Sequence, residues 1–117
     1  MEHVETNLGF STADAEKVEI HLEGGDLRLT FVDWRAAPQR ATFREVLAFC
    51  WVQFDDPGIR DDITYEVVGS VWLARQAELQ GEMPHGYAHY KLCFNAQGVL
   101  EVLALRLDPA AAPQDVT

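Results

Sequence analysis

The chain has 117 residues, a length that predicts a single domain. Hydrophobic residues make up 48% of it and charged residues 24%, a composition that is typical of globular proteins and excludes a disordered chain. Its 9 basic and 19 acidic side chains give a formal net charge of −10. Because nucleic acids and anionic membranes are bound through a basic face, both are poor partners, and a basic protein or a cation is favoured instead.

The N-terminus and the cysteines bear on the cellular compartment. The sequence shows neither a charged-then-apolar leader nor a run of about 18 apolar residues. Cys50 and Cys93 both lie in apolar runs, where a free thiol behaves as a small buried hydrophobe. We therefore expect a cytoplasmic protein with two reduced thiols, and a Cys50–Cys93 disulfide is the alternative.

Three regions differ in composition along the chain. Residues 1–16 are polar with little periodicity, and only Leu8 and Phe10 could anchor them, so we expect a loosely ordered lead segment. Residues 17–108 carry the hydrophobic patterns and form the expected α+β domain. Residues 109–117 are rich in Ala and Pro and are expected to form a flexible tail.

The first predicted element is a hairpin over residues 18–32. Apolar and polar residues alternate on both sides of Gly24-Gly25, and a two-residue glycine turn suits a hairpin because both glycines accept a positive φ. The predicted pairs across it are Leu22 with Leu27, Ile20 with Leu29 and Val18 with Phe31.

The next segment gives conflicting signals. Residues 34–40 form a connection in which Pro38 breaks strand pairing. Thr42 and Glu45 have the spacing of a capping box, which predicts a short helical turn at 42–46. The apolar, aromatic run at 47–54 then favours a strand buried on both faces, and a helix through 42–50 is the alternative.

The second half of the chain contains a strand, a helix and another hairpin. Residues 63–68 alternate as a strand does, and Ser70 is a good N-cap for a helix over 71–80 that Gly81 ends. Strands at 88–94 and 99–107 flank a turn at 95–98, and the last strand is expected to be central. The predicted pairs are Phe94 with Leu100, Leu92 with Val102 and Tyr90 with Ala104.

Together these elements predict an α+β fold made mostly of antiparallel strands. We expect a curved or barrel-like sheet of about five or six strands, built from hairpins, with one helix near residues 70–80.

The residues that could bind a metal or perform catalysis do not form a recognisable site. His85 and His89 flank Gly86, so a helical zinc pair is unfavourable, and a polar loop with surface histidines is the expectation. No catalytic, cofactor-binding or metal-binding residue is predicted, and no cofactor is expected.

The candidate partner-binding residues are acidic and aromatic. Four aspartates flank Pro57-Gly58 and are expected to form a solvated acidic loop that could dock a basic partner. Two aromatic residues at predicted strand or loop ends could anchor a partner. These candidate residues are Asp55, Asp56, Asp61, Asp62, Trp34 and Tyr87.

Three stretches together resemble small, acidic, largely uncharacterised bacterial proteins: LRLTFVDW at 27–34, FREVLAFCW at 43–51 and HYKLCFNAQGVLEVLA at 89–104. Some of those proteins resemble immunity proteins of polymorphic toxin systems. The resemblance covers residues 18–107 and consists of strand and turn patterns. It implies no enzyme activity or cofactor, and it transfers no functional residue.

Three functions follow as hypotheses. The first is a non-enzymatic protein-binding module, in one form an immunity-like inhibitor of a basic partner. The second is a small-ligand-binding or minor enzymatic domain with a pocket in the curved sheet, using residues such as His89, Tyr90 or Tyr65. The third is a homo-oligomeric structural domain that associates through an exposed strand edge.

Overall fold

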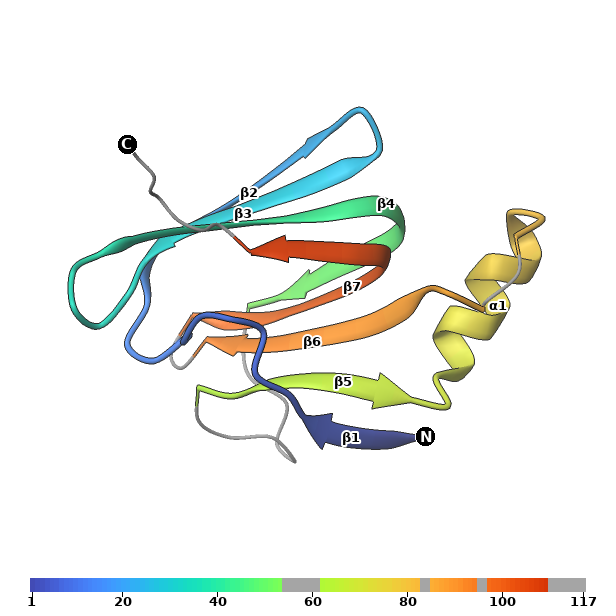
Figure 1. Ribbon diagram of the computed structural model, residues 1–117, viewed down its shortest axis with the longest axis horizontal. Coiled ribbons are helices and arrows are strands. Elements are labelled where there is room, and N and C mark those ends of the chain that lie inside the picture. Colours follow the sequence, from blue (N-terminus) through green and yellow to red (C-terminus); the bar gives the residue numbers. More distant parts are fainter. Residues whose placement is uncertain (54–61, 83–84, 95–96, 110–117) are drawn as a thin grey trace.

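The computed structural model describes residues 1–53, 62–82, 85–94 and 97–109. Within these residues lie seven strands and one helix (Figure 1). In chain order they are β1 (Glu2–Glu5), β2 (Glu16–Glu23), β3 (Asp26–Val32), β4 (Pro38–Val52), β5 (Thr64–Val68), α1 (Val71–Leu79), β6 (Ala88–Phe94) and β7 (Gly98–Pro109).

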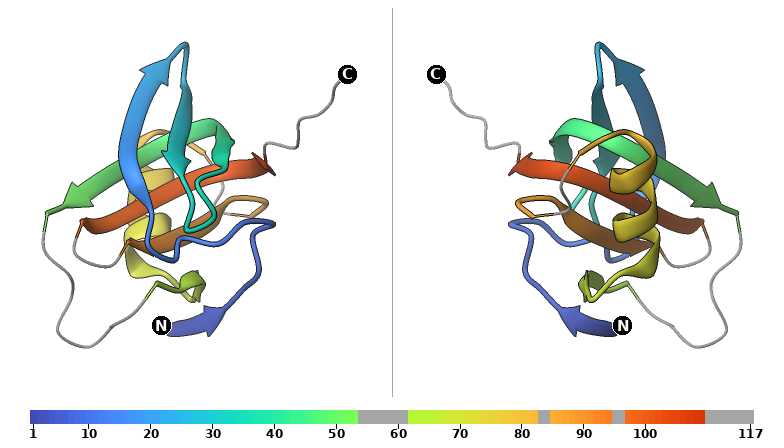
Figure 2. Two further views of the ribbon diagram at one scale, coloured as in Figure 1. Left: turned by 90° about the vertical axis from the view of Figure 1, so that its left-hand side faces the viewer. Right: turned by 90° about the vertical axis from the view of Figure 1, so that its right-hand side faces the viewer.

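All the strands belong to one antiparallel sheet in the order β1-β5-β6-β7-β4-β3-β2. The sheet curls without closing, so β1 and β2 form its two edges, and α1 lies at one end of it (Figures 1 and 2). The α+β class, the curved sheet and the helix near residues 70–80 are therefore confirmed. The sheet has seven strands rather than five or six, because β1 adds a strand that the polar N-terminal sequence does not reveal.

The lead segment at 1–16 departs from the expectation that it is loosely ordered. Its residues 2–5 pair with β5, and Leu8, Thr12 and Ala15 are buried. Leu8 and Ala15 belong to the main core cluster, and Phe10 packs against it. A few apolar anchors thus hold a segment whose average composition is polar. The expected tail lies outside the described residues from position 110 onward.

The first hairpin forms with the predicted register near its turn. Leu22 pairs with Leu27 and Ile20 with Leu29, and both turn glycines have positive φ, +60° at Gly24 and +88° at Gly25. Farther from the turn the register shifts between positions 16 and 19, so residues 17 and 18 both lie opposite Phe31, and the predicted pair of Val18 with Phe31 falls within a bulge. Such a bulge places an extra residue on one strand and increases its twist.

β4 corrects the expectations for residues 34–54. Strand pairing begins at Pro38 and continues to residue 52, so neither the helical turn at 42–46 nor the helix through 42–50 forms. Glu45 has a φ of +53°, and its N–H donates to Oδ1 of Asp26 at 3.0 Å. In this part of β4 the register with β7 shifts between Val46 and Ala48, so an irregular strand forms where the capping-box spacing suggested a helix. β4 is also not buried on both faces, since Val52 is 50% exposed.

The helix α1 begins where the sequence predicts it. Ser70 is the N-cap, and its Oγ accepts the N–H of Leu73 at 3.0 Å. The helix ends at Leu79, and Gly81 follows with a φ of +72°. Because glycine adopts this left-handed conformation without steric cost, it stops the helix as expected.

The second hairpin has a shorter connection than predicted. Phe94 pairs with Gly98 and Leu92 with Leu100, so the predicted register is wrong by two residues. A shift of two residues leaves every side chain on its predicted face, because side chains alternate with a period of two. β7 lies between β6 and β4, which confirms that the last strand is central.

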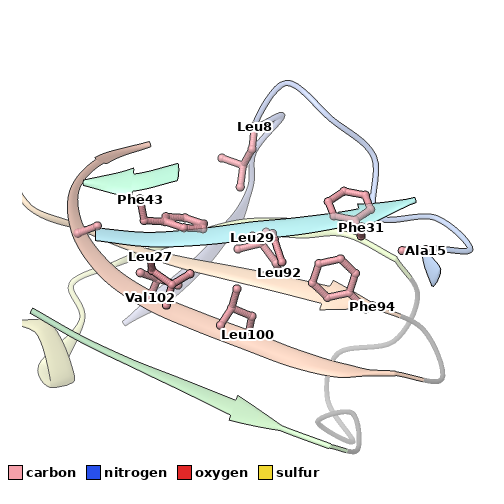
Figure 3. Close-up of a cluster of buried hydrophobic side chains, with 11 residues drawn as sticks. Leu8, Ala15, Leu27, Leu29, Phe31, Phe43, Leu92, Phe94, Leu100 and Val102 are labelled. Atoms are coloured by element: carbon pink, nitrogen blue, oxygen red, sulfur yellow. The ribbon is translucent and has the colours of Figure 1, made fainter. Parts of the chain in front are cut away.

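The hydrophobic core fills the concave side of the curled sheet (Figure 3). Aromatic rings dominate one end of it, where Phe31 contacts Phe94 edge-on with ring centroids 5.5 Å apart. The buried cluster consists of Leu8, Ala15, Leu27, Leu29, Phe31, Phe43, Leu92, Phe94, Leu100, Val102 and Ala104.

Candidate functional site

The edge strand β2 carries a row of exposed carboxylates. We call its three glutamates, Glu16, Glu19 and Glu23, the acidic edge, and all three are exposed. On the opposite face of the same strand, Ile20 packs against the core while Leu22 is 60% exposed. The strand therefore presents negative charge on one face and accessible apolar surface on the other.

The backbone of β2 is also accessible along its outer side. In a hairpin with a two-residue turn, the residues flanking the turn form a hydrogen-bonded pair, and such pairs recur at every second residue. Glu23 flanks the turn opposite Asp26, so residues 19, 21 and 23 direct their N–H and C=O groups toward β3. Ile20 and Leu22 direct theirs outward. Among the described strands, β2 pairs with β3 alone.

A second polar cluster is buried between α1 and the sheet. His89 on β6 is 4% exposed, and its Nδ1 lies 2.7 Å from Oγ of Ser70. Its Nε2 lies 2.7 Å from Oε1 of Glu101 on β7. The ring of Trp72 meets the imidazole edge-on with centroids 5.3 Å apart. These contacts connect the first turn of α1 to two central strands of the sheet.

The burial of His89 corrects the expectation that both histidines lie on the surface. His85 is exposed, whereas His89 lies on a strand that has neighbours on both sides. The sequence identified Ser70 as a helix cap and placed His89 on a strand. It gave no signal that these residues, 19 positions apart, would meet.

Ser70, His89 and Glu101 are hydrogen-bonded in the order hydroxyl, imidazole, carboxylate, which is also the order of a catalytic triad. Here Ser70 is buried and its Oγ already accepts the N–H of Leu73. An imidazole with its proton on Nε2 satisfies the chain, since Ser70 donates to Nδ1 and Nε2–H donates to Glu101. Because the hydroxyl and both ring nitrogens are already hydrogen-bonded, these three side chains fasten the helix to the sheet.

The charges around Glu101 favour its ionised form. The hydrogen bond from His89 lowers the pKa of Glu101 below its ordinary value, burial opposes this effect, and the positive charge of Lys91 reinforces it. Cys50 lies opposite Glu101 in the β4–β7 pair. Burial, followed by the Glu101 charge, raises the pKa of Cys50, which opposes formation of a reactive thiolate. Both cysteines are free thiols, as expected.

The turn between β3 and β4 is organised by the buried carboxylate of Asp33. It accepts the backbone N–H groups of Arg35 and Ala37, the guanidinium of Arg35 and the amide of Gln39 at 2.9–3.0 Å. Burial alone would raise the pKa of Asp33, but these hydrogen bonds together lower it to about 2. The turn therefore holds Trp34 on a well-ordered support.

The two predicted aromatic anchors lie apart. Trp34 is 60% exposed, with the Arg35 guanidinium 5.6 Å from its ring centroid. Tyr87 is half-buried, and burial raises its pKa, as do the charges of Glu82 and Glu45. The β3–β4 turn and the start of β6 occupy opposite ends of the molecule, so the two rings do not share one surface (Figure 1).

The predicted acidic loop falls mostly on residues that the structure does not describe. Asp55, Asp56 and Asp61 lie outside the described residues. Asp62 is described, and its Oδ2 accepts the N–H of Asp14 at 3.3 Å. The loop as a docking site remains a prediction, and the acidic edge of β2 is a site that the sequence pattern alone did not single out.

Metal-site and membrane criteria give negative results within the described part of the chain. No group of three or more His, Cys, Asp or Glu side chains there is placed to hold a metal ion. None of the described helices has the length and apolar character required to cross a membrane. Comparisons of the chain with protein-family models, with curated proteins and with solved structures give no match.

Proposed function

We propose that the protein is a non-enzymatic module that binds a basic protein partner. The observation that carries the proposal is the acidic edge, where three exposed glutamates lie on an edge strand of a chain with net charge −10. Negative surface charge of this kind accelerates association with basic partners. Neutralisation of a basic toxin by an immunity-like protein is one form of this function.

Chemistry elsewhere in the molecule supports binding over catalysis. The hydroxyl of Ser70 is hydrogen-bonded to the N–H of Leu73 and to His89, and burial raises the pKa of the Cys50 thiol. The charge also disfavours nucleic acid and anionic membranes as partners, because both require a basic surface. The exposed Trp34 provides a further aromatic contact surface at one end of the sheet.

The test is affinity capture from the protein's own cell lysate at low and high salt, with the association rate then measured for the captured partner. We expect one stoichiometric basic partner whose binding weakens at high salt. Glu-to-Gln substitution of all three glutamates of the acidic edge should slow association about tenfold at low salt, since electrostatic steering changes rates by this order or more.

A matched control separates local charge from net charge. Changing Glu2, Glu78 and Glu82 to Gln removes the same number of exposed charges from other parts of the surface. This control should retain most of the association rate. Capture of no basic partner at either salt concentration would contradict the proposed function. Equal slowing by both variants would remove the acidic edge as its site.

A further inference from the structure

We propose that the partner supplies an extended segment that adds to the sheet as a strand alongside β2, with basic and apolar residues alternating along it. This inference rests on the proposed function and specifies how that binding occurs. Strand addition to a sheet edge is a general mode of peptide recognition, in which backbone hydrogen bonds provide affinity and alternate side chains provide specificity.

The backbone geometry provides the hydrogen-bonding groups. Ile20 and Leu22 direct their N–H and C=O groups away from β3, and β2 ends the sheet. Lys17, with a φ of +56°, lies in the bulge at the start of the strand. The regular register from residue 19 to residue 23 is therefore the part that a new strand can extend.

The side chains of β2 define what the new strand must carry. Glu19 and Glu23 lie on one face, so side chains of the added strand beside them should be Lys or Arg. His21 lies on the same face, with its Nε2 3.8 Å from Oε1 of Glu19, and both side chains are exposed. Ile20 and Leu22 lie on the other face, where apolar side chains of the added strand would cover the exposed Leu22.

Charge also selects the basic segment over a second copy of this chain. Two β2 strands paired at their edges would bring the acidic edges of both copies together, and like charges on adjacent strands are destabilising. Arg28 on β3 and Lys17 offset only part of this charge, because the acidic edge has three carboxylates. The other edge strand, β1, spans 4 residues against 8 in β2 and offers a shorter template.

The direct test is amide hydrogen exchange of the full chain with a short, end-blocked peptide of alternating lysine and valine. The amides of Ile20 and Leu22 should exchange fast in the free protein and gain about tenfold protection or more with saturating peptide. The amides of Glu19, His21 and Glu23 point toward β3 and serve as internal controls with little change.

Two further peptides separate strand addition from charge attraction. A peptide of alternating lysine and glycine has the same charge without apolar side chains and should protect these amides far less. A peptide of alternating glutamate and valine should not protect them. If the lysine–valine peptide leaves the Ile20 and Leu22 amides unprotected, strand addition is wrong. If the glycine peptide protects them equally, the inferred alternation of basic and apolar residues is wrong.

Ile20→Pro distinguishes failure of this inference from failure of the proposed function. Proline removes an outward N–H without removing a β2–β3 hydrogen bond, a position where edge strands tolerate it. The variant should lose peptide protection and bind the captured basic partner at least tenfold more weakly. If a basic, salt-sensitive partner is captured and binds this variant with unchanged affinity, the proposed function stands and strand addition falls. The exchange experiment on the unmodified chain decides the inference if the variant does not fold.

Discussion

The hydrogen bonds of His89 predict a large loss of stability when this side chain becomes apolar. In His89→Phe the ring still fills the site beside Trp72, but Ser70 and Glu101 each lose a partner at 2.7 Å. A hydrogen bond between neutral groups contributes about 1 kcal/mol and one to a charged group about 1.5–3 kcal/mol. We therefore expect the free energy of unfolding to fall by about 3 kcal/mol.

Urea unfolding followed by tryptophan fluorescence measures this loss, with His85→Phe as the matched control. His85 is exposed, and surface substitutions of this kind usually change stability by less than about 0.5 kcal/mol. Adding Ser70→Ala to His89→Phe should cost less than Ser70→Ala alone, because the two side chains share a hydrogen bond. A decrease in the free energy of unfolding below about 1 kcal/mol in His89→Phe would show that the hydrogen bonds of His89 do not fasten the helix to the sheet.

The two remaining predictions concern a tight contact and acid stability. A Cβ at Gly98 would contact the carbonyl oxygen of Val52 and lie 2.6 Å from a ring carbon of Trp51, so Gly98→Ala should lower the free energy of unfolding, measured by thermal denaturation, by about 1–3 kcal/mol. A loss below about 1 kcal/mol would contradict the predicted steric clash. The pKa of Asp33 is lowered from 3.8 to about 2 on folding, so its carboxylate stabilises the fold above pH 3.8 and loses this effect as the pH falls toward 2. Asp33→Asn should therefore flatten the decline of the urea midpoint across that range, and an unchanged decline would exclude this contribution.

Local sequence signals were sufficient where a short segment determines its own geometry. The glycine pair required positive φ at both positions, and the period-two alternation then fixed the pairs nearest the turn. Ser70 likewise satisfied a backbone donor of the helix that immediately follows it. Each of these features depends on residues that are neighbours in sequence.

The wrong predictions concern contacts with other strands and the length of a turn. The capping-box spacing at 42–46 predicted a helical turn, but this segment pairs with β3 instead, and Asp26 accepts the N–H of Glu45. The second hairpin slipped by two residues because its turn length, rather than its hydrophobic pattern, sets the register. A shift of two residues leaves each side chain of the hairpin on its predicted face of the sheet, which explains why the core residues were still predicted.

The candidate site was hidden from the sequence for the same reason. The bonds of His89 require α1 to lie beside β6 and β7, which no local pattern encodes. The glutamates of the acidic edge become a candidate binding site only when β2 is known to be an edge strand. In a central strand, residues 19 and 23 would need buried partners, whereas at an edge they remain available to a ligand.

The distribution of charge links the fold to the proposed binding. Arg44 bridges Asp26 and Asp108 at 2.8–2.9 Å, so part of the basic complement is committed to holding hairpin β2–β3 against β7. With 9 basic residues against 19 acidic ones, carboxylates must remain in excess at the surface. Their placement on β2 adds negative charge beside outward N–H and C=O groups, an arrangement that discourages self-pairing and leaves a basic strand as the favoured complement.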